Sequence, residues 1–208
     1  MKFIIKTKIV FLLILLVSSC IIVVHEEDAD DFIEPEISLS PKPIIPMSEQ
    51  IIRSSKGDMI SQIPQGWFFV DMESKTSDDI IAVAVNPEYN LSAVFSYVKH
   101  IPAIDSDIET EGLYGLARMC LTRRERKTSG SVKLFGKYQQ INMGNQEFVK
   151  YEFSTTGGAT KAKSAVFVSN AGEFYEFALI PMNINNNPLP QQLEIDDVFK
   201  SILATIKY

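Results

Sequence analysis

The sequence FYEFALI, residues 174–180, has the clearest period of two in the chain. Tyr175, Phe177 and Leu179 fall on one face of an extended segment, and the residues between them fall on the other. Aromatic and aliphatic side chains at this spacing are typical of a β-strand. The pattern therefore predicts a strand over residues 174–180.

Three more runs of strand length precede this segment, near Val132–Tyr138, Gln146–Ser154 and Lys163–Ser169. The triplets TGG at 156–158 and NAG at 170–172 separate the last three strands and have the composition of tight turns. We expect those three strands to form an antiparallel meander.

An amphipathic helix is predicted on each side of these strands. After the loop at 183–190, apolar residues recur at the spacing of one helix face, at Ile195, Val198, Phe199, Ile202, Leu203 and Ile206. Between Asp107 and Arg126 a second stripe consists of Leu113, Leu116, Ala117, Cys120 and Leu121. Acids at the start of this second helix and a basic cluster at its end, Arg123, Arg124 and Arg126, complement the helix dipole. The alternative is that the cluster binds an anion or an acidic partner.

Upstream of that helix, short apolar runs alternate with turn residues, at Met59–Ile63, Trp67–Met72, Ile80–Val85 and Leu91–Val98. Their short connections make antiparallel neighbours the simplest arrangement. This order of elements predicts an α+β fold, a largely antiparallel sheet packed with two main helices. Periodicity leaves open whether each helix covers one face of the sheet or both cover the same face.

The segment IPQGW at 63–67, then strands at Ile80–Asn86 and around Ala93–Phe95, a helix, a meander and a final helix, resembles the PsbP-like fold group. That group also contains a Ran-binding Mog protein and envelope lipoproteins. The resemblance covers residues 56–208 and implies an α/β/α sandwich, with an antiparallel sheet between helices. It implies binding and assembly roles and brings no catalytic residues with it.

Residues 20–55 are predicted to be a linker. Acidic residues crowd the segment from Glu26 to Glu36, and prolines recur from Pro35 to Pro46. Like charges repel and proline cannot donate a backbone hydrogen bond, so neither half favours a packed element. We expect an acidic, proline-rich, disordered tether.

Residues 1–19 have the pattern of a cleaved export signal, with three lysines, an apolar run from Ile9 to Val17 and two serines before Cys20. The segment VSSC resembles the lipobox of bacterial lipoproteins, which implies cleavage before Cys20 and lipidation of this residue. The apolar run continues to Val24, so an uncleaved anchor or an ordinary cleaved signal are the alternatives. From Ile9 to Val24 a helix would span about 24 Å, against roughly 30 Å of hydrocarbon.

Charge and cysteine content limit the partners and the chemistry. Without the three lysines of residues 1–19, 17 basic residues face 26 acidic ones, a net charge of −9. Charge alone therefore attracts neither nucleic acid nor anionic lipid. With Cys20 lipidated, Cys120 is the remaining thiol, so no internal disulfide can form, and its place on the helix stripe predicts burial.

The predicted domain has no coherent set of catalytic residues. His100 is its one histidine, and a zinc site would need three or four nitrogen or sulfur ligands where only His100 and Cys120 are available. No serine lies in a G-x-S-x-G motif, and Asp105 and Asp107 are best explained as acids at a helix start. We expect no metal, no cofactor and no enzymatic activity.

The sequence therefore favours a lipid-anchored protein of the bacterial cell envelope, facing the periplasm or the exterior, whose domain binds a protein or helps to assemble an envelope complex. Trp67 is a candidate partner-binding residue if it is exposed and a core residue if it is buried. The arginines 123, 124 and 126 are the other candidates. The alternative function is a small-ligand carrier or a hydrolase that uses a pocket between sheet and helix near His100.

Overall fold

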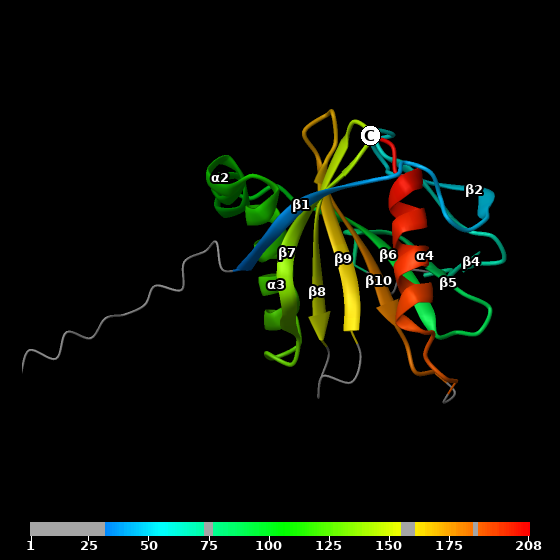
Figure 1. Cartoon of the computed structure of the whole chain (residues 1–208). Helices are drawn as coiled ribbons and strands as arrows, with labels where there is room; N and C mark the ends of the chain where they lie inside the picture. Colours follow the sequence, from blue (N-terminus) through cyan, green and yellow to red (C-terminus); the bar gives the residue numbers. More distant parts are fainter. Residues whose placement is uncertain (1–31, 73–76, 155–160, 185–186) are drawn as a thin grey trace, which may run out of the picture. The chain divides into compact units, whose positions relative to one another are not determined.

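An eight-stranded sheet forms the centre of the described part of the chain (Figure 1). The computed structural model describes residues 32–72, 77–154, 161–184 and 187–208. The strand order is β1-β7-β8-β9-β10-β6-β5-β4, and only the β1–β7 pair among these is parallel. The strands are β1 (Ile33–Leu39), β4 (Phe68–Phe69), β5 (Ile80–Val85), β6 (Leu91–Val98), β7 (Lys133–Met143), β8 (Gln146–Ser154), β9 (Lys161–Val168) and β10 (Phe174–Pro181).

The strand predicted over residues 174–180 is confirmed as β10, which pairs with β9 on one side and β6 on the other. Tyr175 and Phe177 belong to the apolar cluster that contains helix α4 (Gln192–Thr205). Phe174 belongs to the cluster that contains helix α3 (Leu113–Lys127). Both faces of β10 are covered, so its alternation separates two cores rather than a core from solvent.

The helices are divided between the two faces of the sheet, which answers the question that periodicity left open. Helix α3, with α2 (Pro102–Glu111) packed against it, covers one face. Helix α4 covers the other, together with a hairpin of β2 (Met47–Arg53) and β3 (Ile60–Pro64). The prediction of an α+β sandwich is confirmed, with three described helices where two main ones were expected.

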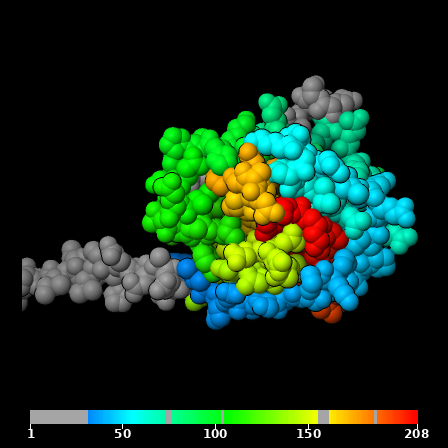
Figure 2. Space-filling view, turned by 90° about the horizontal axis from the view of Figure 1, so that it is seen from above, coloured from blue at the N-terminus to red at the C-terminus, as the bar shows by residue number. Residues whose placement is uncertain are grey.

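The last residue is fixed at one end of the sheet. The ring of this residue, Tyr208, stacks on Phe167 with centroids 5.0 Å apart. The Tyr208 carbonyl accepts a hydrogen bond from Asn170 Nδ2 over 2.7 Å. Figure 2 shows the red C-terminal residues enclosed by the β7–β8 turn and the β9–β10 turn. These contacts close the α4 face at its upper end.

The prediction of an unpacked linker over residues 20–55 is wrong from Phe32 onward, because β1 and β2 lie in this segment. β1 is an edge strand, where a proline without an N–H is tolerated. The Pro35 carbonyl accepts a hydrogen bond from Gln139 Nε2 over 2.9 Å, while Ile37 and Leu39 pack against the α4 cluster. Residues 1–31, with the predicted signal and Cys20, lie outside the described residues.

The single helix predicted from Asp107 to Arg126 is two helices. Gly112 ends α2 with a positive φ of 61°, a conformation that favours glycine. At Gly115, a Cβ atom would lie 2.5 Å from the Asp107 carbonyl oxygen, so the close approach of α2 to α3 requires a residue without a side chain. The stripe from Leu113 onward is confirmed as the buried face of α3.

The early strands also differ in part from expectation. β5 and β6 match their predicted bounds, but β4 is only two residues long, and β3 pairs with β2 instead of β4. None of the helices in the described residues is long and apolar enough to span a membrane.

Candidate functional site

The fold separates the candidate residues onto opposite faces of the sheet. Trp67 belongs to the cluster on the α4 face, whereas Arg123, Arg124 and Arg126 lie on α3. They therefore cannot form one binding site. Two separate depressions lie next to them, an open groove beside Trp67 and a smaller cavity beneath α3.

The groove beside Trp67 forms where the IPQGW turn meets the start of α4. Gly66 has a φ of 85°, and the Trp67 N–H donates to the Pro64 carbonyl over 3.1 Å, which turns the indole back toward the core. Trp67 is only 9% exposed, so its ring forms a wall of the groove instead of a protruding anchor. Ile45 and Pro46 form a second wall of the groove. The Gln65 N–H donates to the Pro46 carbonyl over 3.0 Å and so connects this wall to the turn that carries Trp67.

The groove has a volume of about 570 Å³ and an apolar floor with an acidic rim. Its floor includes the buried Val198, and the buried Trp67 ring forms one wall. Leu193, from the first turn of α4, is 70% exposed at the edge, and Glu194 and Asp197 line the same side. These three α4 residues were not predicted from the sequence, although Leu193 lies outside the apolar stripe of an otherwise amphipathic helix, which was a signal for them.

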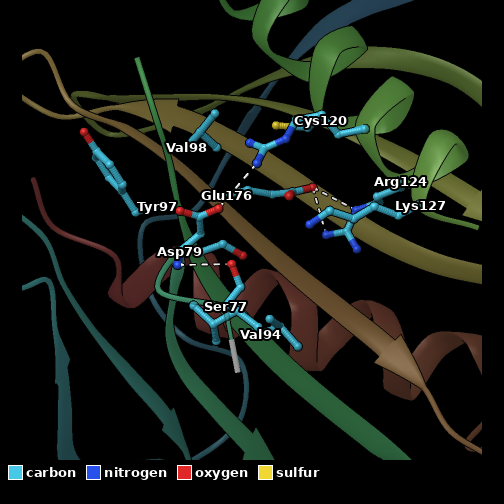
Figure 3. Close-up of a pocket in the computed structure, with 12 residues that line it drawn as sticks. Ser77, Asp79, Val94, Tyr97, Val98, Cys120, Arg124, Lys127 and Glu176 are labelled. Atoms are coloured by element: carbon cyan, nitrogen blue, oxygen red, sulfur yellow. Dashed lines mark hydrogen bonds and ion pairs between the residues drawn. The ribbon is translucent and has the colours of Figure 1, made fainter. Parts of the chain in front are cut away.

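The second depression is a cavity of about 170 Å³ between α3 and strands β5, β6 and β10 (Figure 3). Its walls carry charged groups from both sides. They are Asp79 before β5, Arg123, Arg124 and Lys127 on α3, and Glu176 on β10. Cys120 also faces it, and burial raises the pKa of this thiol well above its usual value. The thiol is therefore neutral, as expected for a buried structural cysteine.

A buried ion pair forms the inner wall of the cavity. Arg124 Nη2 lies 3.0 Å from Glu176 Oε1, and Tyr151 and Ser164 also donate to this oxygen. Burial raises the pKa of the Glu176 carboxyl, but Arg124 and the two hydroxyls outweigh burial and hold the pKa below its usual value. Glu176 is therefore a carboxylate at neutral pH. The guanidinium of Arg124 also covers the Phe153 ring, 4.9 Å from its centroid.

The outer wall is held less tightly. Arg123 Nη2 lies 3.4 Å from Asp79 Oδ2, and Lys99 Nζ lies 2.9 Å from the other carboxylate oxygen. Burial raises the pKa of Asp79, but Lys99 and Arg123 outweigh it, so the net shift is downward. Arg126 is exposed and does not line the cavity. Whether any of the three arginines contacts a partner stays a prediction.

His100 lies in a surface cluster apart from the cavity. Its Nδ1 is 3.0 Å from Asp105 Oδ1, and its Nε2 is 3.7 Å from Glu173 Oε2. Glu173 also accepts a hydrogen bond from Tyr97 over 2.7 Å and pairs with Lys56. Both ring nitrogens thus face carboxylates and not a serine. Within the described residues, no group of three or more histidine, cysteine or acidic side chains is placed to hold a metal ion.

Several solved structures are similar to this chain. Cyanobacterial PsbP (CyanoP) from Synechocystis matches with a TM-score of 0.57 and 14% identity, over 76% of this chain and 92% of that chain. The Ran-binding protein Mog1p of Saccharomyces cerevisiae matches with a TM-score of 0.47 and 11% identity, over 77% and 95% of the two chains. LpqN of Mycobacterium tuberculosis, involved in cell envelope biogenesis, gives 0.40 and 12%, over 77% and 90%.

No protein-family model matches the sequence, and no curated protein matches it either. The identities are too low to show more than the fold. The fold itself is that of the PsbP-like group, as the segment at 63–67 predicted.

Proposed function

We propose that this protein is a lipid-anchored component of the bacterial cell envelope whose domain binds another protein without catalysing a reaction. The observation that carries the proposal is the groove beside Trp67, which is apolar along its floor and acidic at its rim. Leu193 stands exposed at its edge, where an apolar side chain of this size gains free energy only if something covers it.

The occupant of the groove is a segment of a partner protein with an apolar side chain flanked by lysine or arginine. The apolar side chain packs between Trp67 and Val198, and the basic residues lie against Glu194 and Asp197. This assignment follows from charge complementarity, which selects the partner and raises the association rate more than it adds affinity. A groove at the end of a helix that is itself packed on the sheet is also already formed before binding.

Lipidation of Cys20 supports the envelope location, because it would hold the domain at a membrane surface. Mass spectrometry of the full chain compared with Cys20→Ser tests this part. We expect the mass of a processed, acylated chain for the natural sequence and an unprocessed, unmodified chain for the variant. Equal masses apart from the substitution itself would contradict lipidation.

A photo-crosslinking residue at position 193 tests the groove in cells. We expect a discrete crosslinked product from position 193 and none from position 126, which is exposed on the opposite side of the sheet. The groove is blocked with the variant Leu193→Glu. Its matched control is Leu189→Glu, because Leu189 is also exposed (39%) among the described residues but does not line the groove.

Leu193→Glu should abolish the product of a second crosslinker placed at Gln65 on the facing wall, and Leu189→Glu should leave it intact. A purified peptide with an apolar centre and two lysines should compete with crosslinking, and the same peptide with two glutamates should not. Equal competition by both peptides would overturn the assignment of the partner's chemistry.

A further inference from the structure

The two edges of the eight-stranded sheet differ in how they are protected against pairing with another strand (Figure 1). At one edge, β1 carries Pro35 between two glutamates, and proline and charged residues are common means of blocking an edge. At the other edge, β4 and the residue after it present Phe68, Phe69 and Val70, which are 37%, 38% and 40% exposed. Three consecutive exposed apolar residues at an edge attract another chain, so this edge is suited to being paired.

The backbone of Phe69 has hydrogen-bonding groups that β5 does not use. The Val70 N–H donates to the Val83 carbonyl over 2.9 Å, and Phe69 is paired with Ala84 at the next position of the same antiparallel ladder. Hydrogen-bonded and non-hydrogen-bonded pairs alternate in such a ladder, so the N–H and C=O of Phe69 point away from β5. β4 is the last strand of the sheet, and no described residue on its outer side forms a backbone hydrogen bond with Phe69. These two groups can therefore pair with an added strand.

The side chains of the same stretch lie on both faces of the sheet. Phe69 is paired with Ala84, which belongs to the apolar cluster on the α4 face, so the Phe69 ring lies on that face. The groove beside Trp67 is on the same face. Phe68 and Val70 lie on the other face, because successive side chains of a strand alternate. A strand added to β4 would therefore contact apolar side chains on both of its faces.

The charges around β4 favour a basic partner over a second copy of this chain. The Tyr89 ring packs edge-on against Phe68 with centroids 5.5 Å apart, so the exposed Glu88 lies near the start of β4. The exposed Asp71 follows the other end of the pairing. In an antiparallel pair of two β4 strands, each of these acids would lie near an acid of the other copy, and like charges placed opposite each other are destabilising. Lysine or arginine at the ends of a partner strand would meet opposite charge instead.

We propose that an extended segment of the partner protein adds a strand to the outer side of β4, with apolar residues in its middle and lysine or arginine at its ends. Its backbone donates to the Phe69 carbonyl and accepts from the Phe69 N–H, as in other cases of strand addition to a sheet edge. Its side chains alternate between Phe69 on one face and Phe68 and Val70 on the other. This inference rests on the proposed function, because β4 begins one residue after Trp67 and the same partner occupies both sites.

Photo-crosslinking residues in the full chain in cells test the edge separately from the groove. Position 70 lies on the face of the sheet opposite the groove, and we expect it to give a product with the same protein as position 193. A product from 193 without one from 70 would overturn strand addition and leave the groove proposal standing. A product from 70 alone would support strand addition and contradict the groove. A product from 70 with the mass of two copies of this chain, or no product from either position, would overturn the inference.

The variant Phe69→Pro, with Phe69→Thr as its matched control, shows whether the backbone of β4 is used. Both variants remove the ring, but proline also removes the outward N–H, which pairing with β5 does not need. We expect Phe69→Pro to lower the yield of the crosslinked products about tenfold below that of Phe69→Thr. Equal yields from the two variants would overturn strand addition.

A peptide decides the question if circular dichroism shows that Phe69→Pro unfolds the chain. The probe is a peptide of alternating valine and threonine between two lysines, and its analogue carries N-methyl groups on two successive central amides, which removes the donor in either register. We expect the analogue to compete with crosslinking at position 70 about tenfold less well than the unmodified peptide. Equal competition by the two peptides, or competition by neither, would overturn strand addition.

Discussion

The two faces of the central sheet bury their residues by different means. On the α4 face the core is apolar and includes an aromatic stack, in which Phe177 lies between Phe95 at 4.9 Å and Phe199 at 5.4 Å. The α3 face has an apolar cluster as well, but it also contains the ion pair of Arg124 with Glu176, whose carboxylate is buried. Apolar packing depends on volume and tolerates small shifts, whereas a buried pair depends on the position of each atom.

The two faces also differ in their depressions, a wide open groove on the α4 face and a smaller cavity on the α3 face. Aromatic packing on the α4 face can stop at its rim, because leaving part of Trp67 or Leu193 near solvent costs little. On the α3 face Arg124 and Glu176 meet at the inner wall of a cavity between α3 and strands β5, β6 and β10. The cavity is lined by apolar side chains such as Val94 and Val98 as well as by these charged groups.

The comparison is tested most strongly at Arg124. Arg124→Ala leaves the Glu176 carboxylate with only Tyr151 and Ser164 as donors. We expect a loss of about 2–4 kcal/mol in the free energy of unfolding, because removal of one partner strands a buried charge. Urea unfolding measures it. Arg126→Ala, the exposed neighbour on α3, should change stability by less than about 0.5 kcal/mol. Similar values for the two variants would mean that the pair does not stabilise the α3 face.

Acid should lower the stability of the protein partly through protonation of Glu176, and the variant Glu176→Gln should lack this part of the pH dependence. The pKa of the Glu176 carboxyl is lowered in the folded state, so its stabilisation is full above the unfolded pKa and is lost as pH falls through the folded pKa. Thermal unfolding between about pH 6 and about pH 3 should show a smaller loss of stability for Glu176→Gln than for the natural chain. A residual loss is expected in both, since the pKa values of Asp58 and Asp196 are lowered too. Identical pH profiles would contradict the prediction.

The smallest effect is expected on the α4 face. Ile202 is fully buried, and Ile202→Val removes one methylene from apolar packing, which should cost about 0.5–1.5 kcal/mol. Leu193→Val on the same helix is 70% exposed and should change stability by less than about 0.5 kcal/mol. Urea unfolding of both compares them with Arg124→Ala. A larger cost at Ile202 than at Arg124 would reverse the proposed contrast between the faces.

Sequence periodicity predicted the elements whose local propensity agrees with the structure they adopt in the folded protein. β5, β6 and β8 match their predicted bounds because apolar runs and turn residues coincide at their ends. β1 and β2 were missed because their acids and prolines disfavour a strand in isolation, and β1 is stabilised by its pairing with β7. The break at Gly112 was missed because the acidic residues before it were interpreted as the first turn of the helix whose apolar stripe begins at Leu113.

The candidate sites were harder to predict than the fold. Trp67 and two of the three arginines do line depressions, but the packing of α3 on the sheet decides which charges meet, and sequence alone does not show that packing. One local signal did exist. Glu176 is a lone acid in the centre of a strand whose two faces are apolar, and such a residue requires a cationic partner from elsewhere.

The position of β1 has a mechanical consequence. If a lipid holds Cys20, the chain from there to Phe32 extends over twelve residues, which reach at most about 40 Å when fully stretched. Any tension between the membrane and the domain then enters through β1. This strand has a neighbour on one side only, β7, so its backbone pairing with β7 and the packing of Ile37 and Leu39 on the core are what resist that tension. Under force β1 would separate from β7 first, which would lengthen the chain between the membrane and the domain while strands β8, β9 and β10 stay folded.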